Sequence, residues 1–254
     1  MRDVIESLRD TSPALGTSAQ EVRDFFDSFV DTTAIRQDAV LMTDGYDVYD
    51  TVAETHQLVH LACWTHCRRY FIEALQALPK HKRGPEQLAA RFIALIGKPY
   101  HVEAQAKRDG IDTAELGRRR QHESVPVLAE IEALLLANVH AVLPKSLLGQ
   151  ALHYLASQWS KLKRYVEDGR YSIDNNAQEN AIRPFCVGRR NWLFADTVAG
   201  ANASANLYSL LQTCQVNGID GYRYLRALFV ALPGARTAED YAALLPWRIE
   251  LAAA

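Results

Sequence analysis

Two short apolar runs in the first third of the chain predict buried strands. Residues 39–42 (AVLM) and 58–63 (LVHLAC) have strand length and are mostly apolar. The first run leads directly into Thr43, Asp44 and Gly45. An acidic residue that follows a buried strand lies where open α/β sheets place their ligand groups. Asp44 is therefore a candidate site residue, although an ordinary turn also favours Asp before Gly.

The pattern changes to helices alone between about residues 79 and 166. Apolar stripes at helical spacing begin near Leu88, Val127 and Leu148 and predict core-facing helices. Basic clusters lie between the stripes, at residues 80–83, 107–108 and 118–120. We interpret these clusters as solvated faces, with contact to a DNA backbone as the alternative.

The flanking segments carry further helix signals. Ser18 and Glu21 form a potential capping box that opens an amino-terminal helix. Near the other end, one helix is predicted to follow Gly200 and to stop at Asn217 and Gly218, and the last clear helix to stop at residues 233–234. The remaining tail, to residue 254, is an apolar strap.

The segment around Glu179 reads as a turn that feeds a short helix. Asp174 or either following Asn can cap the first turn, and Pro184 is expected to end or bend the helix. Asn176, Glu179 and Arg183 are spaced by about one turn and share a face. A carboxylate between an amide and a guanidinium suits a metal-dependent phosphate site. The alternative is a surface helix with an ordinary Glu–Arg pair.

The segment that follows Pro184 predicts a turn at Gly188 and a short strand or buried edge at residues 192–194. Gly188 is the turn former, and Trp192 begins the apolar run.

Composition limits the class of protein. The chain has 254 residues, 48% of them hydrophobic, and a net charge of −2 with a pI near 6.4. Any nucleic-acid contact must therefore come from local basic patches. No apolar run approaches the roughly 20 residues of a membrane span, so we expect a cytoplasmic protein with free thiols.

Cys63 and His66 form a C-x-x-H pair, which could be half of a zinc site. No second pair with comparable spacing follows. We therefore expect a buried cysteine and a hydrogen-bonded histidine at a strand-to-helix junction.

Short motifs run through the chain in a fixed order. They are TDGY (43–46), CWTHCRRYF (63–71), DGR (168–170), IDNN (173–176), ENAIRP (179–184), GRRNWLF (188–194), YSL (208–210), NG (217–218) and LLPW (244–247). On these motifs the chain resembles the transposases of the bacterial insertion sequence 66 family, a DDE-type group with a ribonuclease-H-like core. The resemblance covers residues 18 to 250.

The resemblance implies an α/β fold with a ribonuclease-H-like core that an all-helical insertion interrupts. In this division, residues 1–78 are the first part of the core, 79–166 the helical insertion, 167–233 the second part with the Glu-bearing helix, and 234–254 a tail. It also implies cytoplasmic, nucleoid-associated localisation.

Carried over to this sequence, Asp44 resembles the second acid of the DDE triad and Glu179 the third. Both would ligate Mg²⁺ (or Mn²⁺), with their carboxylates about 4–8 Å apart. The Cys63 and His66 pair is similar to a structural motif of transposases with such insertions. The residues expected to contact DNA phosphates are Asn176, Arg183, Arg189, Arg190, Arg68 and Arg69.

The sequence departs from the family pattern at the first catalytic Asp. Only 43 residues precede Asp44, and none of the acids among them follows a strand-like run. The chain thus resembles a truncated transposase whose core lacks its first strands, with weak metal binding and little strand transfer alone. The alternatives are an inactive DNA-binding remnant that competes for or regulates transposition, and a structural protein without a DNA role. Expected partners are element-end and target DNA, further copies of the chain and accessory proteins of the element, but no membrane.

Overall fold

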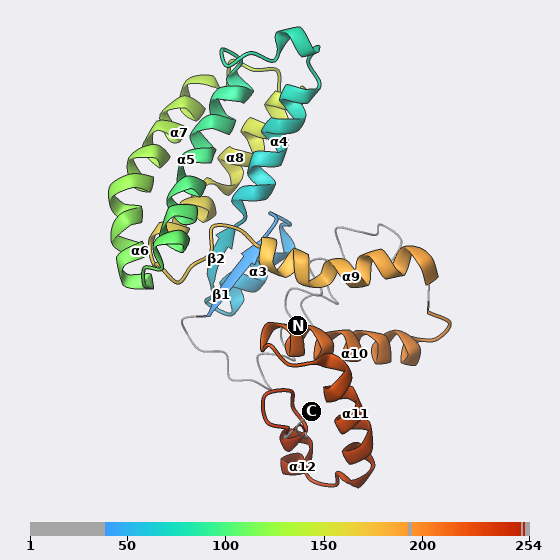
Figure 1. Cartoon of the computed structure of the whole chain (residues 1–254). Coiled ribbons are helices and arrows are strands. Elements are labelled where there is room, and N and C mark those ends of the chain that lie inside the picture. The colour runs from blue at the N-terminus through green and yellow to red at the C-terminus, as the bar shows by residue number, and fades with distance from the viewer. Residues whose placement is uncertain (1–38, 193–194, 250, 252–254) are drawn as a thin grey trace. The chain divides into compact units, whose positions relative to one another are not determined.

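The computed structural model describes residues 39–192, 195–249 and 251. The described residues form two compact units, 39–177 and 178–251, each with its own colour range in Figure 1. The boundary between the units falls in the first turn of helix α9 (Asn176–Trp192). The predicted amino-terminal helix at Ser18 lies outside the described residues.

The first unit begins with a parallel β-α-β element. Strands β1 (Val40–Thr43) and β2 (Val59–Ala62) pair in parallel, with Val40 opposite Val59, and helix α3 (Val48–Thr55) connects them. Leu41, Tyr49 and Val52 are buried in a small core between α3 and the strands. The two predicted strands are confirmed, whereas α3 was not predicted.

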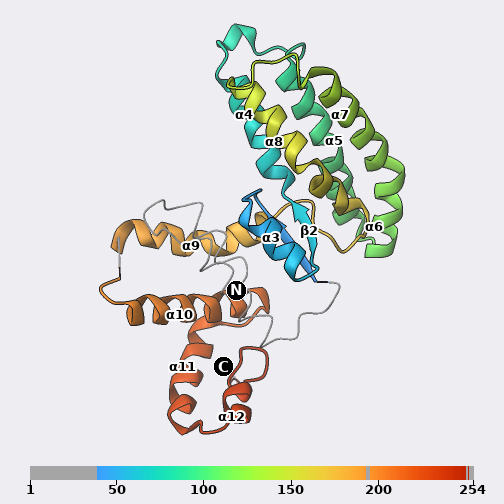
Figure 2. The ribbon, with the colours of Figure 1, turned by 180° about the vertical axis from the view of Figure 1, so that it is seen from behind.

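Helices follow the strands in the first unit, and Figures 1 and 2 show those labelled α4, α5, α7 and α8 side by side as a bundle. In chain order the elements are α4 (Trp64–Gln76), η2 (Lys80–Lys82), α5 (Leu88–Asp109), α6 (Thr113–Arg119), the π-helical turn η3 (Arg120–Ser124), α7 (Val125–Asn138), α8 (Leu147–Leu162) and η4 (Lys163–Val166). The predicted all-helical character between residues 79 and 166 is confirmed.

The bundle core joins α4 to the helices that follow it. The rings of Phe71 on α4 and Phe92 on α5 stack with centroids 4.6 Å apart. Trp64 is fully buried, and its indole N–H donates to the carbonyl of Leu162 at 2.9 Å. Burial of such large rings is the main stabilising contribution here. Helix α4 therefore belongs to the core of the bundle, while the four-part division of the chain stays a prediction.

The second unit consists of helices in its described part. After α9 come α10 (Val198–Val216), α11 (Gly221–Ala231), η5 (Leu232–Gly234) and α12 (Ala238–Ala243). A small cluster of Cys214, Tyr224 and Leu228 holds the last helices together, with Leu244 against it. The Tyr224 hydroxyl donates to the carbonyl of Leu244 at 3.0 Å. The predicted ends of α10 and α11 are confirmed, and the tail forms a short helix with a Thr237 capping box.

Two predictions about α9 are wrong, the turn at Gly188 and the strand or buried edge from Trp192, and the helix does not end at Pro184. The helix continues past Pro184 and through Gly188 to Trp192, which is 43% exposed rather than part of a buried edge. Inside a helix Pro184 lacks the N–H that would bond to the carbonyl of Asn180, and its ring crowds that carbonyl. Because Asn180 is exposed, water can serve that carbonyl and the helix need not end. Residues 193–194 of the predicted strand lie outside the described residues.

Candidate metal and nucleic-acid site

Asp44 lies at the carboxyl end of β1, as predicted. Thr43, the last strand residue, is fully buried, and Asp44 beyond it is half-buried. The Asp44 carboxylate accepts a hydrogen bond from the backbone N–H of Tyr46 at 3.3 Å. Gly45 between them has φ of +98°, a conformation that L residues rarely adopt. The turn therefore needs glycine and holds Asp44 at the edge of the sheet.

Helix α8 braces this turn from a distant part of the sequence. The Tyr154 hydroxyl donates to the main-chain carbonyl of Asp44 at 2.6 Å. A Cβ atom at Gly45 would lie 3.1 Å from both Tyr154 and Gln158. On its other side the Tyr154 ring packs against Tyr70, with centroids 4.7 Å apart. Burial raises the pKa of Tyr154 well above its usual value, so the hydroxyl stays a donor at all physiological pH. Sequence reasoning missed this brace, because the stripe on α8 was read from its apolar positions alone.

The start of α9 is fixed by a compact polar network within the first unit. Asp174 accepts hydrogen bonds from the backbone N–H of Asn176 at 3.1 Å and from its side-chain amide at 2.7 Å. The same amide donates to the Thr65 hydroxyl at 3.1 Å, and that hydroxyl donates to Asp174 at 3.0 Å. The predicted capping by Asp174 is confirmed. Asn176 thus has a structural role at the helix start, and its contact with DNA stays a prediction.

The remaining predicted residues of the Glu179 motif lie along α9. Glu179 is in its first turn and partly buried, and Arg183 follows one turn later and is exposed. Arg189 and Arg190 lie in the last turn, where a positive charge also complements the carbonyl end of the helix dipole. Asp44 and Glu179 belong to different units, so their convergence on one cation stays a prediction.

Two further groups of predicted residues lie on α4 or just before it. Arg68 is partly buried and Arg69 is exposed. The predicted burial of Cys63 and His66 at the junction of β2 and α4 is confirmed, while their structural role and the hydrogen bond expected of His66 stay predictions. Burial raises the pKa of the neighbouring Cys67 thiol, which therefore remains protonated. Within residues 39–192, 195–249 and 251, no three His, Cys, Asp or Glu side chains are grouped as a metal site.

The number of nearby ligands determines whether the described residues fit a metal. Asp44 supplies a hard carboxylate oxygen of the kind that Mg²⁺ prefers, at an open sheet edge. One carboxylate is not a metal site by itself, so a cation at Asp44 stays a prediction.

The basic cluster 118–120 is not a free cationic face. The Arg120 side chain is 1% exposed and binds Glu103 through two nitrogen–oxygen contacts of 2.8 Å. Its third nitrogen donates to the carbonyls of Tyr165 and Asp168 at 2.7 and 2.8 Å. Arg118 and Arg119 pair with Glu115 and Asp109. The interpretation of 118–120 as a solvated face is therefore wrong for Arg120, and its charge is used to join α5, η3 and the segment after η4.

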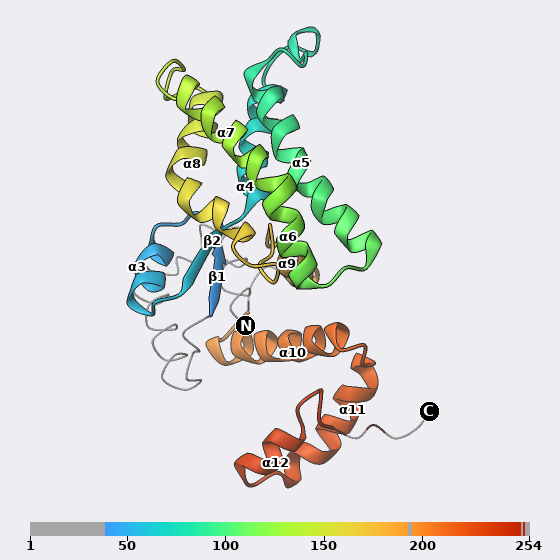
Figure 3. The same ribbon diagram turned by 90° about the vertical axis from the view of Figure 1, so that its left-hand side faces the viewer.

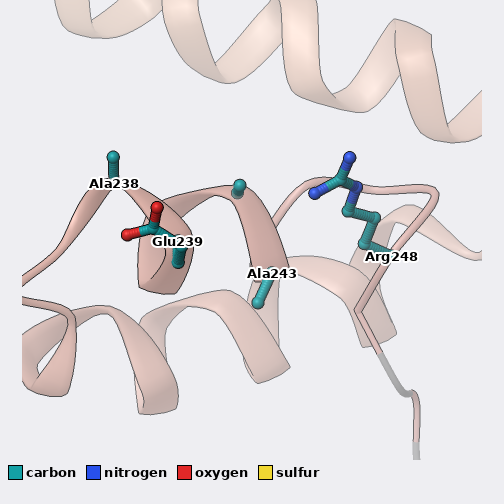
Figure 4. A pocket seen from close by; sticks show the side chains of 5 residues that line it. Ala238, Glu239, Ala243 and Arg248 are labelled. Atoms are coloured by element: carbon teal, nitrogen blue, oxygen red, sulfur yellow. The ribbon is translucent and has the colours of Figure 1, made fainter.

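An open hollow beside α12 is separate from these residues. Figure 4 shows its lining, which consists of Ala238, Glu239, Ala242, Ala243 and Arg248. None of the predicted site residues is among them. Small side chains and one pair of opposite charges give this hollow no catalytic constellation.

The comparisons with known proteins agree with the motifs. The model of the "Transposase IS66 family" matches residues 18–203, and that of the "IS66 C-terminal element" matches residues 209–247. The chain therefore belongs to the IS66 transposase family. No solved structure matches it, so the ribonuclease-H-like core rests on resemblance alone.

Relatives with similar sequences occur in Sinorhizobium fredii (strain NBRC 101917 / NGR234). The chain is 30% identical to "Uncharacterized protein y4qI" in an alignment that covers 95% of the chain and 46% of that protein. It is 28% identical to "Uncharacterized protein y4jD" over 82% of the chain and 40% of that protein. The chain thus spans less than half the length of these curated relatives. No helix in the described parts of the chain is both long and apolar enough to cross a membrane.

Proposed function

We propose that the chain carries two acids of a DDE-type DNA transposase, with a ribonuclease-H-like core built around the β1–α3–β2 element. The observation that carries the proposal is the position of Asp44. It directly follows a parallel strand with alternate residues buried, at the end of the strand where α/β folds place ligand groups, and its turn is braced by Tyr154. Membership of the IS66 transposase family supports the same reading.

In this proposal Asp44 and Glu179 hold Mg²⁺ or Mn²⁺. A cation held there would supply Lewis-acid chemistry, activating a water or 3′-hydroxyl and balancing the charge on the leaving oxygen of a DNA phosphate. The chain's own residues do the positioning. The exposed guanidinium groups of Arg183 and Arg190 on α9 can bind phosphates of element-end and target DNA in a bidentate manner, and Arg69 on α4 can do so from the first unit. Further copies of the chain and accessory proteins are proposed as partners.

The direct test is nicking of element-end DNA in the presence of Mg²⁺ by the full chain and by Asp44→Asn and Glu179→Gln. The natural chain is expected to nick DNA weakly, and each substitution removes a charge that would bind the cation, so we expect each to abolish this nicking. Asp47→Asn is the matched control, because Asp47 is exposed three residues later and its side chain does not cap α3. Nicking that persists in Asp44→Asn would refute the proposal.

The alternative is a DNA-binding remnant without catalysis. In that case the chain would not nick DNA but would shift element-end DNA on a gel, and its affinity would fall as the salt concentration rises. A chain that neither nicks nor binds DNA would instead be a structural protein.

A further inference from the structure

A chain of polar contacts lies behind the strand that carries Asp44. The buried Thr43 hydroxyl is 2.8 Å from His60 Nε2 on the neighbouring strand. The other ring nitrogen, Nδ1, is 3.3 Å from the Asp50 carboxylate on α3. Lys161 on α8 donates to the same Asp50 oxygen at 2.6 Å. Figure 3 shows α3, the two strands and α8 in this part of the first unit.

The contacts fix which nitrogen of His60 carries the proton. Burial and the positive charges of Lys161 and Arg164 lower its pKa to about 4, against the opposing effect of Asp50, so the ring is neutral at pH 7. A neutral imidazole has one N–H. The nitrogen that faces the Asp50 carboxylate carries it, which leaves Nε2 to accept the Thr43 hydroxyl. The four groups thus form one directed series from α8 to β1.

A buried polar series stabilises the pairing of two strands less than apolar packing would, because its polar groups must be desolvated. Thr43 and His60 are both buried, and an apolar pair of the same shape would stabilise the sheet without the cost of desolvating polar groups. A satisfied polar network instead fixes one geometry. Thr43 is the last residue of β1 and Asp44 follows it directly, so the bond at Thr43 restrains the peptide group that joins the two residues.

We propose that Thr43 and His60 are positioning residues, which hold the Asp44 carboxylate in the orientation that binds the cation. The proposal rests on the proposed function, since it assumes that Asp44 is a metal ligand. Asp50 and Lys161 complete the support from α3 and α8. Such supporting residues around metal ligands change affinity by about 10- to 100-fold when they are replaced.

The test is site-resolved binding of Mn²⁺ to the full chain, measured by paramagnetic broadening of the Gly45 and Tyr46 amide resonances. Thr43→Val keeps the shape and removes the hydroxyl, and we expect it to raise the half-saturating Mn²⁺ concentration about tenfold. Thr43→Ser restores the hydroxyl and should stay within about twofold of the natural chain. Ser keeps the hydroxyl of Thr but lacks its methyl group. An Mn²⁺ affinity that Ser restores is therefore due to the hydroxyl and not to packing of the methyl group.

The controls separate the two proposals. Asp44→Asn should abolish the broadening, and broadening that is unchanged in this variant would refute the metal role of Asp44. If Asp44→Asn abolishes the broadening but a folded Thr43→Val binds Mn²⁺ as tightly as the natural chain does, only the positioning role is overturned. If Thr43→Val does not fold by circular dichroism, His60→Leu, which removes the hydrogen-bond partner of the Thr43 hydroxyl, is held to the same criterion.

Discussion

The two predicted acids are placed by different kinds of interaction. Asp44 lies in a turn that is held by residues far away in the sequence, with Tyr154 bonded to its carbonyl across 110 positions. Glu179 lies on a helix, and its spacing to Arg183 follows from helical periodicity alone. In the first unit, therefore, the fold and the site depend on the same buried contacts. On α9 the exposed arginines can change without loss of stability.

Arg120 gives the strongest test of this contrast. Arg120→Ala leaves the partly buried Glu103 without its partner and removes the donor to two carbonyls, so we expect a loss of about 3–5 kcal/mol in the free energy of unfolding. Urea denaturation measures this loss. Arg118→Ala, which breaks an exposed pair on the preceding helix, should change stability little. If Arg120→Ala were as stable as the natural chain, the bundle would not depend on this contact.

His60 predicts a pH dependence of somewhat smaller size. The unfolded ring takes up a proton near pH 6.5, and the folded ring only near pH 4. Stability from this group is therefore complete above pH 6.5 and is lost as the pH falls towards 4, by up to about 3 kcal/mol. Thermal unfolding of the natural chain and of His60→Gln across this range measures the difference. Parallel curves for the two proteins would contradict a lowered pKa at His60.

The arginines of α9 should give the smallest effect on stability. Arg183→Gln and Arg190→Gln replace exposed side chains, so the unfolding midpoint should not move. Each should weaken binding to element-end DNA and reduce the slope of log affinity against log salt by about 1. Arg118→Gln is the matched control in the first unit and should leave the slope unchanged. If the slope of log affinity against log salt is the same in all three variants, α9 does not contact DNA.

The same contrast explains what the sequence could predict. Local signals were sufficient for β1, β2, the helical stretch and the Asp174 cap, because apolar runs and capping side chains act within a few residues. They were misleading at Pro184, where an exposed helix tolerates the missing N–H.

Contacts across the fold left no local signal. Tyr154 contacts Asp44, and His60 contacts Thr43, only after the helices and strands have packed. The sequence around Arg120 does not distinguish it from the other residues of its basic cluster. Asp44 and Glu179 could be named in advance because their motifs resemble a family, not because any pattern of polarity joins them.

An experimental structure of the chain grown with Mn²⁺ tests the central claim most directly, since anomalous scattering locates the metal. We expect Mn²⁺ bound by both Asp44 and Glu179, with the two carboxylates about 4–8 Å apart. Carboxylates on opposite sides of the molecule, or Glu179 buried in an unrelated ion pair, would rule out the shared metal site.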